Sequence, residues 1–453
     1  MVAASSGKRP LSAKQLKNRT ETTKSHRFEP FSQRVAKLKI DPIHRVRRAS
    51  FGEEEDGTSS HFRSAFEHWT ELNLSETFVQ FARRVGPLSE SLAQILYHED
   101  RIMGLLTEFI DKRDQHAMEA LLSLLAQFAR DLGVRFEKHF AGAVTLVASV
   151  AATHPDVEVV EWSFSCLAWT FKFLSRLLVP DLRQLLGIMT PYLGKERQKP
   201  FVARFAAESM SFLIRKAGLV YYKNKTPLEN AVSFLFHDLF ETAASSSSKN
   251  MQAYKEGLMA MFSDAMKGVK GGIHSNGTDI LNCLLDALPA EDDLRSGLAL
   301  EVVGGAIINL CHNTTAETFG SVQDTIAAFI KTQSKGVDNH RPEMCCRLIF
   351  VCVSTRKGSR VSSWKTVHQT LLLLLQKAAA EPGAYANSIP QLLTTVAYAL
   401  QSSPMDEMLP FMRSLMEAVT NEKFSAYFLS FCATFSEWGA ERFHGVVLPH
   451  FQK

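Results

Sequence analysis

From about residue 61 to residue 453, one amphipathic pattern follows another, and no stretch shows the two-residue alternation of a β-strand. Large apolar side chains recur three or four residues apart, as in the runs that begin at Leu121 and Phe164, which places them on one face of a helix. Turn residues separate these runs. The expected breaks are Thr153–Asp156, Val179–Asp181, Lys199–Pro200, Thr226–Pro227, Leu288–Pro289 and Ser403–Pro404. The sequence therefore predicts an all-α fold.

Two pairs of helical segments repeat at nearly the same spacing. The run FSCLAWTFKFL from Phe164 matches FAAESMSFLIR from Phe205 at an offset of 41 residues, and Leu409-Pro410 matches Leu448-Pro449 at an offset of 39. A period of about 40 residues with two helices per unit is typical of HEAT and armadillo repeats. Proline is normally costly inside a helix, yet three apolar helical patterns contain one, at Pro191, Pro410 and Pro449. We therefore expect residues 61–453 to form a HEAT/armadillo-like α-solenoid.

Charge is distributed unevenly along the chain. Residues 1–50 hold thirteen Lys or Arg and three acids, residues 51–60 hold four acids and no Lys or Arg, and the rest has a net charge of −2. This pattern excludes a uniformly basic nucleic-acid binder but leaves a locally basic one open. We expect residues 1–60 to form a flexible N-terminal extension, first basic and then acidic.

A short amphipathic element interrupts the basic extension. After Pro30, the side chains of Phe31, Val35 and Leu38 fall on one helical face. Such a short helix is marginal in water, so we expect it to dock either on a partner's groove or on the solenoid itself, with the neighbouring cations facing phosphate. The basic run is explained equally well as a nuclear localisation patch. Candidate contacts with RNA or a partner are Phe28, Phe31, Arg34, Lys37, Lys39, Arg45, Arg47 and Arg48.

No catalytic or metal-binding motif was found in the sequence. Nucleophile-elbow, zinc-protease, dinucleotide-binding and calcium-loop patterns do not occur. The seven cysteines are scattered and form no C-x-x-C pair, which indicates buried thiols in a reducing compartment. We expect no enzyme activity, no cofactor, no metal ion, no small-molecule substrate and no membrane-spanning segment.

Three stretches of the chain resemble the DRIM family, whose name abbreviates "down-regulated in metastasis" and whose members are the Utp-twenty components of the small-subunit processome. The family's N-terminal signature is matched by FEPFSQRVAKLKIDPIHR from Phe28, and its first helical segment by FRSAFEHWTELNLSETF from Phe62. Its most recognisable HEAT helix is matched by PFVARFAAESMSFLIRK from Pro200. The resemblance is strong over residues 26–240 and fainter beyond.

The resemblance implies a non-enzymatic nucleolar scaffold of the 90S pre-ribosome that supports pre-18S ribosomal RNA processing and assembly of the small ribosomal subunit. Implied partners are pre-ribosomal RNA, the guide snoRNP and other processome proteins. Family members are much longer, so the sequence looks like an N-terminal portion, in which Glu441–Phe451 reads as a first HEAT helix without its second. The alternative is a HEAT-repeat nuclear transport receptor or another protein-binding solenoid. Transport receptors typically have acidic inner surfaces, for which a body charge of −2 is poor support.

Overall fold

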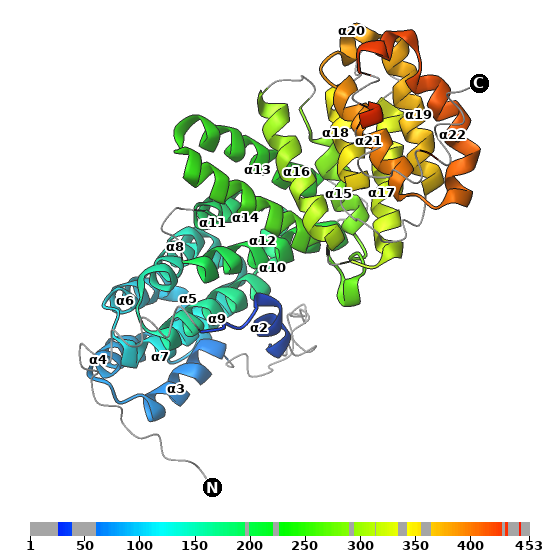
Figure 1. Ribbon diagram of the computed structural model, residues 1–453. Coiled ribbons are helices and arrows are strands. Elements are labelled where there is room, and N and C mark those ends of the chain that lie inside the picture. Colours follow the sequence, from blue (N-terminus) through cyan, green and yellow to red (C-terminus); the bar gives the residue numbers. More distant parts are fainter. Residues whose placement is uncertain are drawn as a thin grey trace. The chain divides into compact units, whose positions relative to one another are not determined.

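The structure is a computed structural model in which every regular element of the described part of the chain is a helix (Figure 1). Among those residues, β pairing is limited to an isolated antiparallel bridge between Lys267 and Ile273. The predicted all-α class is therefore confirmed. The described residues are 26–38, 60–194, 199–220, 226–289, 294–312, 314–333, 342–354, 364–427, 431–433 and 444.

The chain divides into two compact units, Met1–Leu213 and Ile214–Lys453. We call them unit 1 and unit 2. The first helices of unit 1 are α2 (Phe31–Lys37), α3 (His61–Leu72), α4 (Glu76–Val85), α5 (Leu92–Tyr97), α6 (Glu99–Asp111) and α7 (Gln115–Leu132). They are followed by α8 (Glu137–Thr153), α9 (Val157–Phe173), α10 (Ser175–Leu178), α11 (Arg183–Met189) and α12 (Pro200–Val220), within which the division between the units falls.

Unit 1 is built around α7, which packs against both α3 and α9. The apolar residues of α7 that gave the helical pattern, including Leu121, Leu125 and Phe128, are all buried. Alternate helices are also neighbours, because α6 lies beside α4 and α8. Burial of one apolar stripe per helix against two neighbours is what stabilises a stack of helix pairs.

Unit 2 shows the same arrangement in two layers. In one layer, α16 packs against α14 and α18; in the other, α13, α15, α17 and α19 follow one another. This stacking of alternate helices is the architecture of an α-solenoid and confirms the predicted repeat class. The helices are α13 (Thr226–Ser245), α14 (Ser248–Met266), α15 (Gly277–Asp286), α16 (Leu294–His312), α17 (Ala316–Gln333), α18 (Pro342–Ser354), α19 (Trp364–Ala380), α20 (Pro382–Tyr385), α21 (Ile389–Ser402) and α22 (Met405–Val419).

Prolines lie at helix boundaries, inside α22 and in a 3₁₀ turn. Each of the six expected breaks falls at a helix boundary, and Pro410 lies inside α22 as predicted. The prediction for Pro191 was wrong in detail, because the helix tightens there into a 3₁₀ turn, Thr190–Tyr192, that follows α11. Proline has no N–H to continue an α-helical hydrogen-bond ladder, which explains the change. Pro449 and all of the segment Glu441–Phe451 except His444 lie outside the described residues.

Helix α16 is long and apolar enough to cross a membrane by length and composition alone, and 56% of its apolar 18-residue window is buried inside the protein. It packs against α14 and α18 of unit 2, and side chains such as Val302, Ala306 and Ile307 are fully covered. A core helix of a helical stack passes the same length and composition test. The packing accounts for the apolar composition of α16.

Candidate functional site

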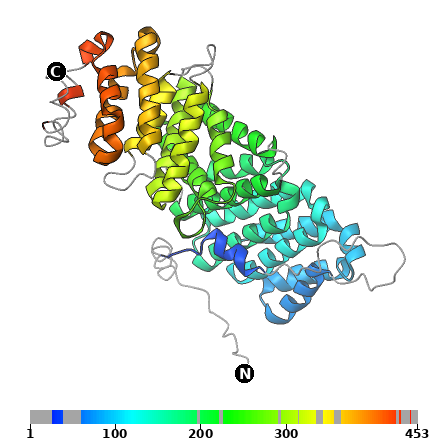
Figure 2. The same ribbon diagram turned by 90° about the vertical axis from the view of Figure 1, so that its right-hand side faces the viewer.

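The amphipathic element of the N-terminal extension is docked on unit 1. Residues His26–Leu38, which we call the anchor segment, run extended to Pro30 and then form α2. Helix α2 lies against α9, and both views show it there as the dark-blue helix (Figures 1 and 2). Of the two docking modes that the sequence left open, the structure shows the intramolecular one for these residues.

Both ends of α2 are capped by charged side chains from distant helices. At its start, the backbone N–H of Phe31 donates to Glu208 Oε2 at 2.7 Å, since Pro30 at the N-cap offers no side-chain cap. At its end, Lys172 Nζ donates to the carbonyl oxygens of Val35 at 2.5 Å and Leu38 at 2.7 Å. A carboxylate at the N-terminus and an ammonium at the C-terminus both complement the helix dipole. These caps help a seven-residue helix to persist.

Arg34 joins α2 to α9 through a buried guanidinium that is 2% exposed. Its Nη1 donates to the carbonyl of Glu161 at 2.9 Å and to Ser165 Oγ at 2.8 Å, while Nε donates to the carbonyl of Glu29 at 3.0 Å. Its Nη2 also pairs with the Glu161 carboxylate. Because each nitrogen of the guanidinium has an acceptor, this buried charge is compensated.

Two phenylalanines complete the attachment. The Phe31 ring, 1% exposed, lies with its centroid 5.6 Å from that of Phe205 and 5.3 Å from that of Phe212. The Phe28 ring lies 4.2 Å from Phe201. Tilted and edge-on aromatic pairs of this kind add stability beyond the apolar area that they bury. The anchor segment is thus held by ring packing as well as by charge.

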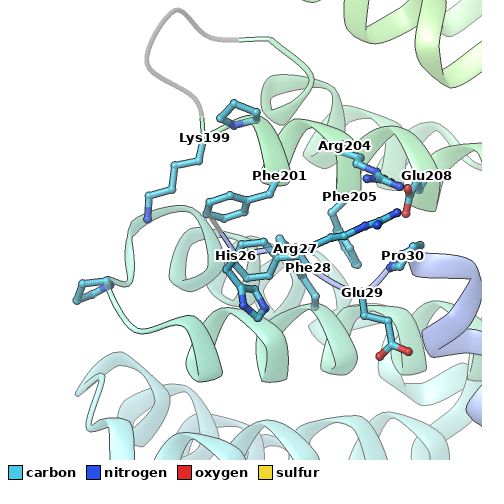
Figure 3. A pocket seen from close by; sticks show the side chains of 13 residues that line it. His26, Arg27, Phe28, Glu29, Pro30, Lys199, Phe201, Arg204, Phe205 and Glu208 are labelled. Carbon is cyan, nitrogen blue, oxygen red and sulfur yellow. Dashed lines mark hydrogen bonds and ion pairs between the residues drawn. The ribbon is translucent and has the colours of Figure 1, made fainter. Parts of the chain in front are cut away.

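A pocket of about 670 Å³ opens where the extended part of the anchor segment crosses the start of α12 (Figure 3). In this view, the side chains of Phe28, Phe201 and Phe205 lie between Lys199 at one end and the Arg204–Glu208 pair at the other. The lining residues are His26, Arg27, Phe28, Glu29, Pro30, Pro155, Phe164, Lys199, Pro200, Phe201, Arg204, Phe205 and Glu208. The result is an aromatic floor with a charged rim.

The structure describes half of the sequence-predicted contact residues. Phe28, Phe31, Arg34 and Lys37 all lie on the anchor segment, where Lys37 is exposed and pairs with Glu29 at 2.7 Å. The others, Lys39, Arg45, Arg47 and Arg48, lie outside the described residues. Contact of any of the eight with RNA or a partner protein stays a prediction.

Sequence reasoning missed the other side of this site. Glu161, Lys172 and Glu208 hold the anchor segment, but they are more than a hundred residues away along the chain and carry no motif. A partial signal existed in Phe201 and Phe205, which share one face of α12 at a spacing of four residues.

Comparison with known proteins finds two curated relatives of this chain. The chain is 33% identical over 350 residues to "U3 small nucleolar RNA-associated protein 20" of Schizosaccharomyces pombe. It is 28% identical over 352 residues to the Saccharomyces cerevisiae protein of the same name. Each alignment covers 77% of this chain and 13% of the relative, so the chain spans about an eighth of the length of these relatives.

No family model matches the chain. The crystal structure of an engineered protein covers 84% of it at 12% identity, but its TM-score of 0.24 is too low to carry an argument. The two curated relatives confirm the resemblance seen in the sequence over the 77% of this chain that aligns with each of them.

Proposed function

We propose that this chain is a non-enzymatic helical scaffold of the small-subunit processome, acting in the nucleolus in pre-18S ribosomal RNA processing and small-subunit assembly. Its partners would be pre-ribosomal RNA, the guide snoRNP and other processome proteins. Two relatives are named for their association with U3 small nucleolar RNA, which supports the proposal. The chain spans only 13% of the length of these relatives, so the role of a whole relative is assigned to this chain as a proposal.

The docked anchor segment is the observation that carries the proposal. Lys172 holds the carbonyl of Leu38, and the basic run continues in the sequence from Lys39 to Arg48. The helical stack therefore fixes the point from which this run starts. Cations that neutralise phosphates supply sequence-independent affinity for RNA, and a rigid stack offers a long surface for proteins. In this proposal residues 61–453 act as one repeat array behind an extension formed by residues 1–60.

The burial of the cysteine thiols agrees with a non-enzymatic scaffold. All seven cysteines lie among the described residues, where none forms a disulfide and six are buried. Burial raises the pKa of Cys166 to about 12 and also raises the pKa of Cys352. Since the thiolate is the nucleophile, neither group is activated at neutral pH.

Co-sedimentation tests the proposal. The tagged 453-residue chain is expressed in cells, and the lysate is separated on a density gradient and probed for the chain and for U3 RNA. We expect the chain to migrate with the large particles that contain U3 RNA and unprocessed 18S sequence. If the chain stays at the top of the gradient, or migrates with import cargo instead, the scaffold proposal is wrong and the transport-receptor alternative gains support.

A further inference from the structure

The pocket beside the anchor segment has an aromatic floor with ring surface left uncovered. Phe164 and Phe205 are buried, and their rings stack at 4.2 Å with an angle of 8° between their planes. Above them, Phe28 and Phe201 are only half-buried, with 33° between their planes. Half-covered rings over a rigid aromatic base provide a surface on which another flat ring can stack.

The charges at the rim do not cancel. Glu208 is engaged by Arg204 at 2.7 Å and by the N–H of Phe31, and Glu29 is engaged by Lys37. Across the described part of the chain, no carboxylate forms an ion pair with Arg27 or Lys199. Among these residues, Lys199 Nζ donates to a neutral acceptor, the carbonyl of His154, at 3.1 Å.

Of these two cations, Lys199 gives the stronger evidence for an anion-binding site. It is half-buried beside Phe201, with its ammonium 5.6 Å from the ring centroid, and burial lowers its pKa. A partly desolvated ammonium that contacts a carbonyl and a ring face is stabilised when an anion binds beside it. The pocket therefore combines a stacking surface with a place for negative charge.

We propose that this pocket binds one unpaired nucleotide of RNA, with its base stacked on Phe201 and Phe28 and its phosphate held by Lys199. The inference rests on the proposed function and deepens it by naming a site. Base stacking on phenylalanine tolerates any sequence, because every base has a π-face. Recognition of unpaired RNA commonly uses aromatic side chains in this way.

The charge of the surrounding chain favours RNA over an acidic peptide as the occupant. Five of the residues that line the pocket, His26 to Pro30, belong to residues 1–50, whose net charge of +10 attracts a polyanion. A nucleotide also brings one flat ring and one phosphate together, which matches one aromatic floor and the Lys199 ammonium beside it. An acidic peptide would have to supply the ring and the charge from separate side chains.

The first experiment compares two RNA strands on the full 453-residue chain. One is a short single strand that carries the fluorescent base 2-aminopurine, and the other has the same phosphates but abasic residues. We expect the base-containing strand to bind about 5- to 160-fold more tightly, the range for stacking of one base, and its fluorescence to be quenched on binding. Equal affinity for the two strands, or unquenched fluorescence, would overturn the proposal.

Variants then assign the effect to the pocket. F201L keeps an apolar side chain but removes the ring, so we expect most of the base-dependent difference to vanish. The variant K199Q is expected to weaken both strands equally and to reduce the salt slope by about 0.7, as for one phosphate. The matched control is F173L, since Phe173 is another half-buried ring with a cation over it, Arg130, on α9 but outside the pocket.

The proposal can still be tested if the F201L variant does not fold. If F201L melts early, crosslinking of a 4-thiouridine strand to the wild-type chain still decides, because the proposal requires the crosslink at Phe28 or Phe201. A crosslink elsewhere would overturn the proposal. It would also be overturned if an acidic peptide that contains phenylalanine, but not RNA, slowed amide exchange at Phe201. Wild-type chain that enters pre-ribosomal particles without base-dependent binding refutes the pocket alone, whereas chain that enters no particle refutes the proposed function.

Discussion

Arg34 is the residue on which the docking of the anchor segment depends most. Its guanidinium is buried and donates to α9 and to the backbone of Glu29, so removal of the side chain leaves the Glu161 carboxylate without its main partner. Hydrogen bonds to charged groups contribute about 1.5–3 kcal/mol each to stability. The cost should fall on the docked state of the segment, because the core of unit 1 around α7 does not include it.

We therefore expect R34A to undock residues 31–37 while unit 1 stays folded. Amide hydrogen exchange in α2 should accelerate by roughly tenfold or more, with exchange in α7 unchanged. The control is K37Q, because the Lys37 side chain is 68% exposed and its surface ion pair should contribute about 0–1 kcal/mol. Fast exchange of α7 in R34A, or equal effects of the two variants, would contradict this assignment.

At this scale the sequence predicted one side of the contact only. Phe28, Phe31 and Arg34 stand out because they follow helical spacing after a proline within a basic run. Their partners Glu161 and Glu208 are ordinary acidic residues of long helices. Contacts between residues more than a hundred positions apart depend on how α9 and α12 pack. The local sequence around these residues contains no signal that predicts them.

At the scale of elements, charged side chains from elsewhere in unit 1 begin and end its N-terminal helices. Glu208 accepts from the first N–H of α2, and Asp131 of α7 does the same for α3, accepting from the N–H groups of His61 at 3.0 Å and Phe62 at 2.8 Å. Such caps satisfy backbone groups that a helix cannot satisfy by itself. The N-terminal helices therefore depend on the rest of unit 1 for their ends.

Replacing Lys172 tests this dependence at the other end of α2. K172M keeps the aliphatic stem but removes the ammonium that caps two carbonyls. The last turn of α2 should fray, and amide exchange there should rise by about tenfold, while K172R should retain most of the protection. Unchanged protection of α2 in K172M, measured by the same exchange experiment, would show that the rings of Phe28 and Phe31 suffice.

The ion pairs around Glu99 should make the stability of the folded state depend on pH in the acid range. Glu99 begins α6 and is bonded to Arg135 at 2.8 Å and to Lys138 at 2.6 Å; the hydrogen bond from Arg135 is the main reason that its pKa is lowered to about 2. A carboxyl with a depressed pKa stabilises the folded state above its unfolded value of 4.5, and this contribution is lost as pH falls toward 2. The urea midpoint of wild type should therefore fall more steeply between those values than that of E99Q. Parallel curves for the two proteins would refute this account.

For the whole molecule, the sequence predicted the architecture better than the site. A repeat of about 40 residues, with apolar stripes between prolines, restricts a strand-free chain to stacked helix pairs. The match of Phe164 with Phe205 came from that repeat, and the two rings prove to be neighbours, stacked at 4.2 Å. The pocket beside them was not predicted, because it depends on where the anchor segment crosses α12.

The basic run should govern how tightly the whole chain holds RNA. Changing Lys37, Lys39, Arg45, Arg47 and Arg48 to alanine removes five candidate phosphate contacts. For single-stranded RNA each contact contributes about −0.7 to the slope of log affinity against log salt, so the slope should flatten by roughly 3 to 4. The loss should be the same for different RNA sequences, since phosphate contacts carry no sequence information directly. A variant that keeps the wild-type slope would show that the run serves another purpose, such as nuclear import.

The most direct test of the central claim is to identify the RNA that this chain touches in cells. Ultraviolet crosslinking of the tagged chain, followed by sequencing of the attached RNA, measures those contacts without reconstitution. The scaffold account predicts enrichment of U3 RNA and of 18S precursor sequence, reduced in the five-alanine variant. Crosslinks no stronger than those of a tagged control protein, or confined to unrelated RNA, would contradict it.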